Sequence, residues 1–141
     1  MNVKITSDST CDLSQELIEK YSIAITPLSV TLGEATGRDG LDIKPEDIYA
    51  YVDETKSLPK TSAVNVEEYR RVFEFWKKRG YAIVHFCISS EFSSTYQNAC
   101  TASKDMKDVF IIDSRNLSTG QGLLVLRGAE LAQEGRDAEA I

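Results

Sequence analysis

The sequence has few of the residues on which disulfide and metal chemistry depend. Its 141 residues include three cysteines and one histidine. Cys11, Cys87 and Cys100 stand far apart with no paired spacing, so we expect neither a disulfide framework nor a zinc site. We therefore interpret them as structural thiols in a reducing, cytoplasmic setting, and we expect no metal and no other cofactor.

Long apolar runs and an excess of positive charge are also missing. No stretch approaches the about 18 consecutive apolar residues of a membrane span, and residues 1–8 contain no apolar run like that of a signal peptide. The formal net charge is −6, from 22 Asp and Glu against 16 Lys and Arg. Because a phosphate backbone is repelled by that balance, we expect no nucleic-acid partner.

The usual catalytic signatures cannot be assembled. His85, the only histidine, lies in an apolar run over 81–88, which favours a core position over a general base. Without it no Ser, His and Asp triad can be built. The glycines at 120–122 lack the lysine of a phosphate loop. Asp8 has no second acid nearby to hold magnesium, and Asp113 is better explained as a turn cap. We therefore expect a protein that is not an enzyme.

Strand and helix patterns alternate along the chain. Residues 3–6, 81–88 and 109–112 are β-branched or continuously apolar, which predicts three neighbouring central strands. Alternation of strands with helices is typical of an α/β fold, here a mostly parallel open sheet with helices on both faces. The remaining expected elements are strands at 23–26 and 28–32, helices near 13–21, 45–54, 65–79, 93–103 and 118–134, and loops at 33–40 and 57–64.

Local signals set several of the expected boundaries. Asp12 is predicted to cap the first helix, Pro45 to start the second, and Asn65 with Glu68 to form a capping box at the third. The chain length suits one domain. Residues 135–141 resemble a turn that starts one more helix, so we expect a second domain to be absent from this chain.

Hydroxyl side chains gather where the predicted strands end. Residues 6–10, 89–95 and 113–120 follow the three central strands, and Thr61-Ser62 lies before the helix predicted from residue 65. Ligands of open α/β sheets bind beyond the carboxyl ends of the strands. Hydroxyls beside helix amino termini favour anions, because free N–H groups and the helix dipole point the same way. Helix capping would explain one such loop. Four of them predict a carboxylate or phosphate site.

Five pieces of the sequence, taken in order, match one known family. They are Ile5-Thr6-Ser7-Asp8-Ser9-Thr10 followed by Asp12-Leu13, then Pro59-Lys60-Thr61-Ser62, then Ile88-Ser89-Ser90 through Ser93-Ser94-Thr95-Tyr96-Gln97, then Ile112-Asp113-Ser114, and last Ser118-Thr119-Gly120-Gln121-Gly122. Their order and spacing resemble the DegV family, the fatty-acid-binding subunits of bacterial fatty-acid kinases. The resemblance spans the whole chain, so residues 1–141 would be a DegV-type N-terminal α/β domain, with the C-terminal domain absent.

The resemblance also implies a ligand and a partner. A long-chain fatty acid would lie between two domains with its carboxylate on the hydroxyls of the first. An ATP-dependent fatty-acid kinase subunit would phosphorylate that carboxylate. Carried over to this chain, the carboxylate contacts fall on Ser62 and Ser93, with Thr61, Ser94 and Thr95 as further candidates.

Two departures from the family pattern bear on the expected site. The family usually has Gly where this chain has Ser94, and a Gln-Pro-Ser run where it has Ala63-Val64-Asn65. Without the second domain, we expect an apolar strip beside Ser62 and Ser93, covered by self-association, crystal contacts or the lipid tail. Two alternatives stay open: a phosphoryl- or acyl-transfer enzyme that uses Asp8 or Ser93, and an interaction domain without a ligand.

Overall fold

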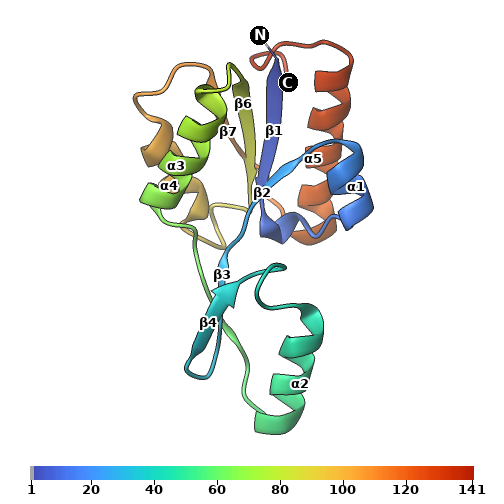
Figure 1. The fold of residues 1–141 in the computed structure, drawn as a ribbon, viewed down its shortest axis with the longest axis vertical. Helices are drawn as coiled ribbons and strands as arrows, with labels where there is room; N and C mark the ends of the chain where they lie inside the picture. Colours follow the sequence, from blue (N-terminus) through green and yellow to red (C-terminus); the bar gives the residue numbers. More distant parts are fainter. Residues whose placement is uncertain (1) are drawn as a thin grey trace.

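The body of the molecule is built on a four-stranded parallel sheet. A computed structural model describes residues 2–141 and gives the strand order β2-β1-β6-β7 (Figure 1). This order confirms that residues 3–6, 81–88 and 109–112 form neighbouring strands, although β7 lies at an edge of the sheet rather than at its centre. The strands are β1 (Val3–Asp8), β2 (Ala24–Thr26), β6 (Ala82–Cys87) and β7 (Val109–Asp113), and every neighbouring pair is parallel.

Helices cover both faces of this sheet, as the sequence predicts for an α/β fold. One face carries α3 (Val66–Lys77) and α4 (Thr95–Ser103), and the other carries α1 (Gln15–Lys20) and α5 (Ser118–Gln133) (Figure 1). Side chains of β6 alternate between the two layers: Ile83 packs below α3 and α4, and Val84 packs toward α5. All six residues of β6 are buried, which explains why its sequence is an unbroken apolar run around one histidine.

A smaller unit projects from the carboxyl edge of the sheet. It contains an antiparallel sheet of order β4-β3-β5 and the helix α2 (Figure 1). Its elements are β3 (Ser29–Leu32), β4 (Ala35–Arg38), α2 (Pro45–Thr55) and β5 (Lys60–Ser62). We call these elements and the segments between them the projecting unit.

The projecting unit corrects two predicted loops. The regions 33–40 and 57–64 contain the strands β4 and β5, both of which pair with β3. Each is three or four residues long and mostly exposed, so neither shows the apolar alternation that identifies a strand. Their strand structure comes from pairing with β3.

The first helix also starts later than predicted. Asp12 has a left-handed backbone, with φ of 49°, and does not cap the helix. Ser14 takes that role, because its side chain accepts a hydrogen bond from the backbone N–H of Leu17 at 3.4 Å. The start at Pro45 and the capping box of Asn65 and Glu68 are confirmed.

The ends of the remaining helices agree closely with the sequence. The helix from Val66 ends at Lys77, and Gly80 follows with φ of 81°, the left-handed conformation that glycine adopts most easily. Residues 135–141 form turns, without the further helix that their pattern suggests. Among residues 2–141, no helix combines the length and the apolar character that crossing a bilayer requires.

Candidate functional site

Ser93, Ser94 and Thr95 lie at the amino terminus of α4. The Ser93 hydroxyl accepts a hydrogen bond from the backbone N–H of Thr95 at 3.2 Å, and it lies 2.8 Å from the Thr95 hydroxyl. Thr95 is fully buried, Ser93 is half-buried and Ser94 is exposed. Ser93 and Ser94 can therefore meet a ligand, while Thr95 orients Ser93 from below.

Thr61 and Ser62 lie on β5 of the projecting unit. In the register with β3, Thr61 is opposite Val30 and Ser62 is opposite Ser29. Both hydroxyls are exposed. Because successive side chains of a strand point to opposite faces, Thr61 and Ser62 cannot both point at one ligand from the same side.

A hydrogen bond fastens the two hydroxyl segments to each other. The carbonyl of Val64, two residues after Ser62, accepts from the Asn98 side chain at 2.8 Å. Asn98 is one helical turn beyond Ser94, to whose carbonyl its own N–H donates. Val64 itself is buried in the core below α3 and α4. The segment that carries Ser62 is therefore held against the first turn of α4, at the carboxyl edge of the sheet.

Asp8 fixes the strand ends at this edge. One carboxylate oxygen accepts from the backbone N–H of Ile88 at 2.7 Å, and the other accepts from the Gln121 amide at 2.9 Å and the Thr10 N–H at 3.1 Å. Burial raises the pKa of Asp8 above its usual value, and the hydrogen bonds lower it again only in part. Asp8 is fully buried with both oxygens engaged, so the geometry does not support it as a nucleophile.

Sequence reasoning missed the role of Gln121. Its amide also lies 3.1 Å from the Ser7 hydroxyl, and its side chain is fully buried. Gln121 thus joins α5 to the end of β1 across more than a hundred residues of sequence. Its place between two glycines of α5 offers no local signal of this contact.

Asp113 and His85 have the structural roles that the sequence predicts. Asp113 accepts from the Ser90 hydroxyl at 2.6 Å and from the backbone N–H of Arg115 at 3.0 Å, so it caps the turn after β7. His85 is fully buried and hydrogen-bonded through Nδ1 to the Thr6 hydroxyl at 2.7 Å. Burial lowers its pKa to about 3, which keeps the ring neutral. It is a core residue that cannot reach a ligand.

The cysteines and acids of the described chain do not form a metal cluster. Cys11 and Cys87 are buried, Cys100 is half-buried, and all three are free thiols. Within residues 2–141 no three His, Cys, Asp or Glu side chains stand close enough together to hold an ion. Burial raises the pKa of both Cys11 and Cys87, so these thiols stay protonated and unreactive.

Exposed apolar side chains stand close in sequence to the candidate hydroxyls. Phe92, the neighbour of Ser93, is 64% exposed, and Leu58 at the approach to β5 is 80% exposed. We call Phe92 and Leu58 the apolar border.

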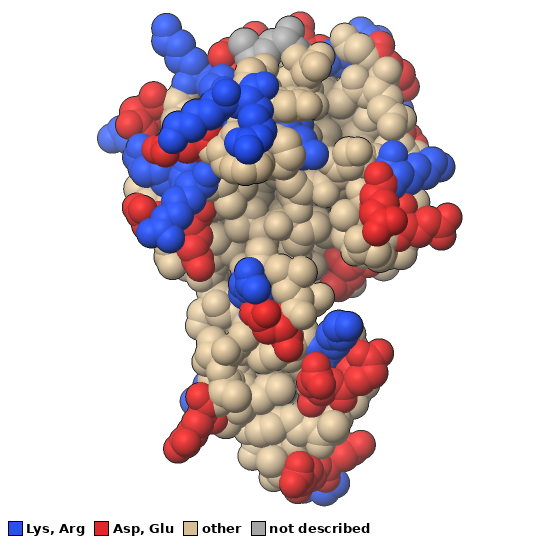
Figure 2. Space-filling model, viewed as in Figure 1, with Lys and Arg blue, Asp and Glu red and all other residues tan. Residues whose placement is uncertain are grey.

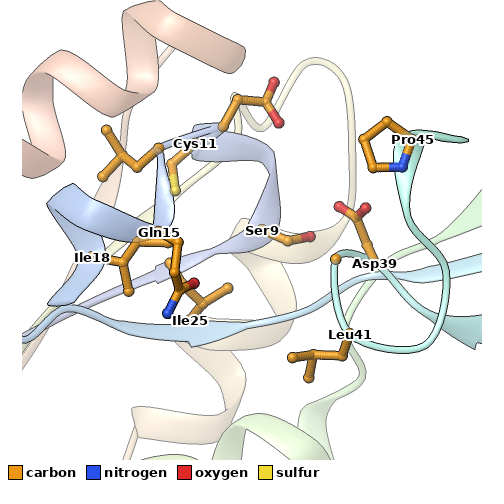
Figure 3. A pocket seen from close by; sticks show the side chains of 11 residues that line it. Ser9, Cys11, Gln15, Ile18, Ile25, Asp39, Leu41 and Pro45 are labelled. Atoms are coloured by element: carbon orange, nitrogen blue, oxygen red, sulfur yellow. The ribbon is translucent and has the colours of Figure 1, made fainter.

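A separate cavity of about 570 Å³ lies between the body of the molecule and the projecting unit (Figure 3). Its walls come from the segment 9–18, from Ile25 of β2 and from the loop 39–45. Leu13 and Ile25 belong to the core on the α5 side of the sheet. We call the five predicted carboxylate contacts, Thr61, Ser62, Ser93, Ser94 and Thr95, the hydroxyl edge. None of them lines this cavity, although Ser9, directly after β1, does.

Comparison with known proteins identifies the family. The profile of the family described as "Uncharacterised protein, DegV family" matches residues 2–141. A DegV domain-containing protein of Clostridium acetobutylicum is 39% identical over 142 residues, which cover 99% of this chain and 50% of the relative. One of Clostridium perfringens is 37% identical over 135 residues, 94% of this chain and 48% of the relative. The chain thus spans about half the length of these curated relatives.

Solved structures agree with the sequence comparison. A fatty-acid-binding DegV family protein from Thermus thermophilus superposes with a TM-score of 0.91 at 33% identity, over 99% of this chain and 50% of that protein. A stearic acid-binding protein from Eubacterium ventriosum gives a TM-score of 0.88 at 36% identity, over 98% of this chain and 50% of that protein. The fold and the order of the hydroxyl segments lead to one conclusion: this chain belongs to the DegV family.

Proposed function

We propose that this protein binds one long-chain fatty acid by its carboxylate, through Ser62 and Ser93. Fatty-acid binding by relatives of the same fold supports the ligand. The observation that carries the site is the hydrogen bond from Asn98 to the Val64 carbonyl, which holds the Ser62 segment against the start of α4. Ser94 is a further contact, and Thr95 supports Ser93. Thr61 points to the opposite face of β5 from Ser62, so it is the alternative contact on that strand.

The geometry at Ser93 suits an anion. When Thr95 donates both its N–H and its hydroxyl to the Ser93 oxygen, the Ser93 proton is left to donate to a ligand. The first N–H groups of α4 and the positive end of its dipole favour negative charge at the same place. A carboxylate oxygen in front of Ser93 would meet both.

The two ends of a fatty acid contribute differently to binding. Burial of about fourteen methylenes stabilises the complex by about 11 kcal/mol before costs, at about 0.8 kcal/mol each. Each hydroxyl bond to an ionised carboxylate adds about 1.5 to 3 kcal/mol. The tail therefore dominates affinity, and the hydroxyls decide which end is held at the edge.

A tail of that length needs a second wall. The apolar border at Phe92 and Leu58 supplies one side only. Because the relatives are about twice as long as this chain, we propose that residues 1–141 are the N-terminal domain of a two-domain carrier. The tail would then lie against the second domain.

Native mass spectrometry tests ligand binding directly. The chain extended by this second domain, purified from bacteria, should carry a mass that matches an acid of 16 to 18 carbons. Delipidation should remove that mass, and added palmitate should restore it. A protein that never gains such a mass is not a fatty-acid carrier.

We also propose that this cytoplasmic carrier presents the carboxylate to an ATP-dependent kinase, which converts it to an acyl phosphate. The carrier itself would do no chemistry: no residue at the hydroxyl edge is a general base. Ser93→Ala should lower acyl-phosphate formation by purified kinase more than it lowers binding, because chemistry needs one fixed geometry. Ser57→Ala is the matched control, because Ser57 is exposed and its hydroxyl has no hydrogen-bond partner within residues 2–141. Equal rates in all three proteins would exclude Ser93 from presentation.

A further inference from the structure

The cavity beside α1 has the dimensions of a ligand site. Its volume of about 570 Å³ falls within the about 300–1,000 Å³ of small-molecule pockets. It opens between the body of the molecule and the loop 39–45 of the projecting unit (Figure 3). Ser9 lines it, but none of the five residues of the hydroxyl edge does. The fatty-acid proposal therefore leaves this cavity without a role.

Most of its wall is apolar. Leu13, Ile18 and Ile25 line it from the body, and Leu41 lines it from the loop. Leu41 is 59% exposed, and it lines the same cavity as Ile25 (Figure 3). An apolar ligand placed between these two side chains would remove both from water, which is the main source of binding free energy at such sites.

The loop that closes the cavity is held in place. The N–H of Asp39 donates to the Leu28 carbonyl at 2.9 Å, and the N–H of Gly40 donates to the Ile43 carbonyl at 2.9 Å. Arg38 and Asp42 form an ion pair at 2.7 Å across the same turn. The cavity is thus preformed, so a ligand need not order the loop.

Two carboxylates without a cation give the cavity its charge. Asp12 and Asp39 line it, and over residues 2–141 neither forms an ion pair, whereas Asp42 is neutralised by Arg38. Among the described residues 2–141, no Lys or Arg lines the cavity. The projecting unit is acidic as a whole, with seven Asp and Glu against four Lys and Arg in residues 29–62. On the face seen in Figure 2, Lys and Arg side chains are densest over the body on the α3 side, and a few also lie on the projecting unit.

We propose that this cavity binds a small organic cation with an apolar body, a primary alkylammonium being the simplest example. The apolar part lies between Ile25 and Leu41, and the ammonium group meets Asp12 and Asp39. A fatty-acid carboxylate is excluded by the same two charges. The protein then has two sites of opposite preference, with the anion on the α4 side of the sheet and the cation beside α1.

Octylammonium is a suitable probe, with octanoate and octanol as matched ligands of the same length. At pH 7 we expect octylammonium to shift the backbone amide resonances of Gly40 and Leu41, and calorimetry should give a dissociation constant at least about tenfold lower than that of octanol at this site. Octanoate should leave the two amides unchanged. Equal shifts with octanoate, or no shift with octylammonium, would overturn the proposal.

Variants separate this site from the fatty-acid site. Asp39→Asn should weaken octylammonium binding about five- to tenfold, and Asp53→Asn, at an exposed position on α2, should not change it. Leu41→Lys places an ammonium group of the protein at the cavity mouth, and it should block the probe. Ser93→Ala should have no effect. If Ser93→Ala weakens octylammonium binding and Asp39→Asn does not, the probe binds at the hydroxyl edge. That result would refute the cavity beside α1 as a cation site and would leave the fatty-acid proposal standing.

Discussion

Replacing Asp8 by asparagine changes one atom of a fully buried hydrogen-bond network. The substitution should still lower the free energy of unfolding by several kcal/mol. Three partners of the Asp8 side chain can only donate: the N–H of Ile88, the N–H of Thr10 and the amide NH2 of Gln121. The Thr10 hydroxyl lies 2.6 Å from Asp8 and 2.7 Å from the Gln121 oxygen, so its proton can serve either acceptor. Asparagine presents one oxygen and one NH2 group, so at least one donor faces another donor in a fully buried site. Loss of a hydrogen bond to a charged group and a buried unpaired donor together predict about 2 to 4 kcal/mol of destabilisation.

Urea unfolding at pH 7, followed by circular dichroism, measures this loss. The expected stability of a domain this size, about 5 to 15 kcal/mol, leaves the variant folded and the transition measurable. Asp53→Asn removes the same charge from an exposed position on α2, and it should change the free energy of unfolding by less than about 0.5 kcal/mol. If Asp8→Asn is as mild as this control, the carboxylate does not hold the strand ends together.

Three further substitutions test other parts of the fold. His85 has a pKa lowered to about 3 by burial, so its stabilisation is present above pH 6.5 and is lost as the pH falls. Between pH 7.5 and pH 5 the wild type should lose about 2 kcal/mol more than His85→Gln, and parallel urea curves would contradict this. Gly122→Ala puts a methyl group 2.6 Å from the Cys11 carbonyl oxygen. It should cost about 1 to 3 kcal/mol in thermal unfolding, against a small effect of Leu123→Ala on the exposed side of α5. Within residues 2–141 the buried Thr26 hydroxyl has no hydrogen-bond partner. Thr26→Val should therefore be neutral or stabilising by up to about 1 kcal/mol, and a clear fall in melting temperature would show a missed partner.

The parts of the fold that the sequence predicts are those with a local signal. The strand β6 is buried on both faces, so its residues are apolar without interruption. The capping box of Asn65 and Glu68 predicts the start of the helix from Val66. The strands β4 and β5 carry no such signal, because they are short, exposed and held by pairing with β3. Ser14 and not Asp12 caps α1, because Asp12 itself adopts the left-handed conformation. No local sequence pattern specifies that conformation at Asp12.

The candidate site likewise has features that the sequence predicts and contacts that it does not. Hydroxyl-rich strand ends are visible in the sequence, and the family resemblance singles out Ser62 and Ser93 among them. What brings their segments together is the contact of Asn98 with a backbone carbonyl 34 residues earlier. The buried bond of Gln121 to Asp8 spans 113 residues. Contacts between residues so far apart depend on the tertiary structure, and local sequence patterns do not predict them.

A titration with palmitate and hexadecanol tests the central claim most directly, on the chain extended by its proposed second domain. Ser62→Ala and Ser93→Ala should each raise the dissociation constant for palmitate about ten- to a hundredfold, since each loses a hydrogen bond to an ionised carboxylate. Binding of hexadecanol, which has the tail without the charge, should change by less than about threefold. Palmitate affinities that match the wild type in both variants would show that these serines only shape the backbone, and that the carboxylate is held elsewhere.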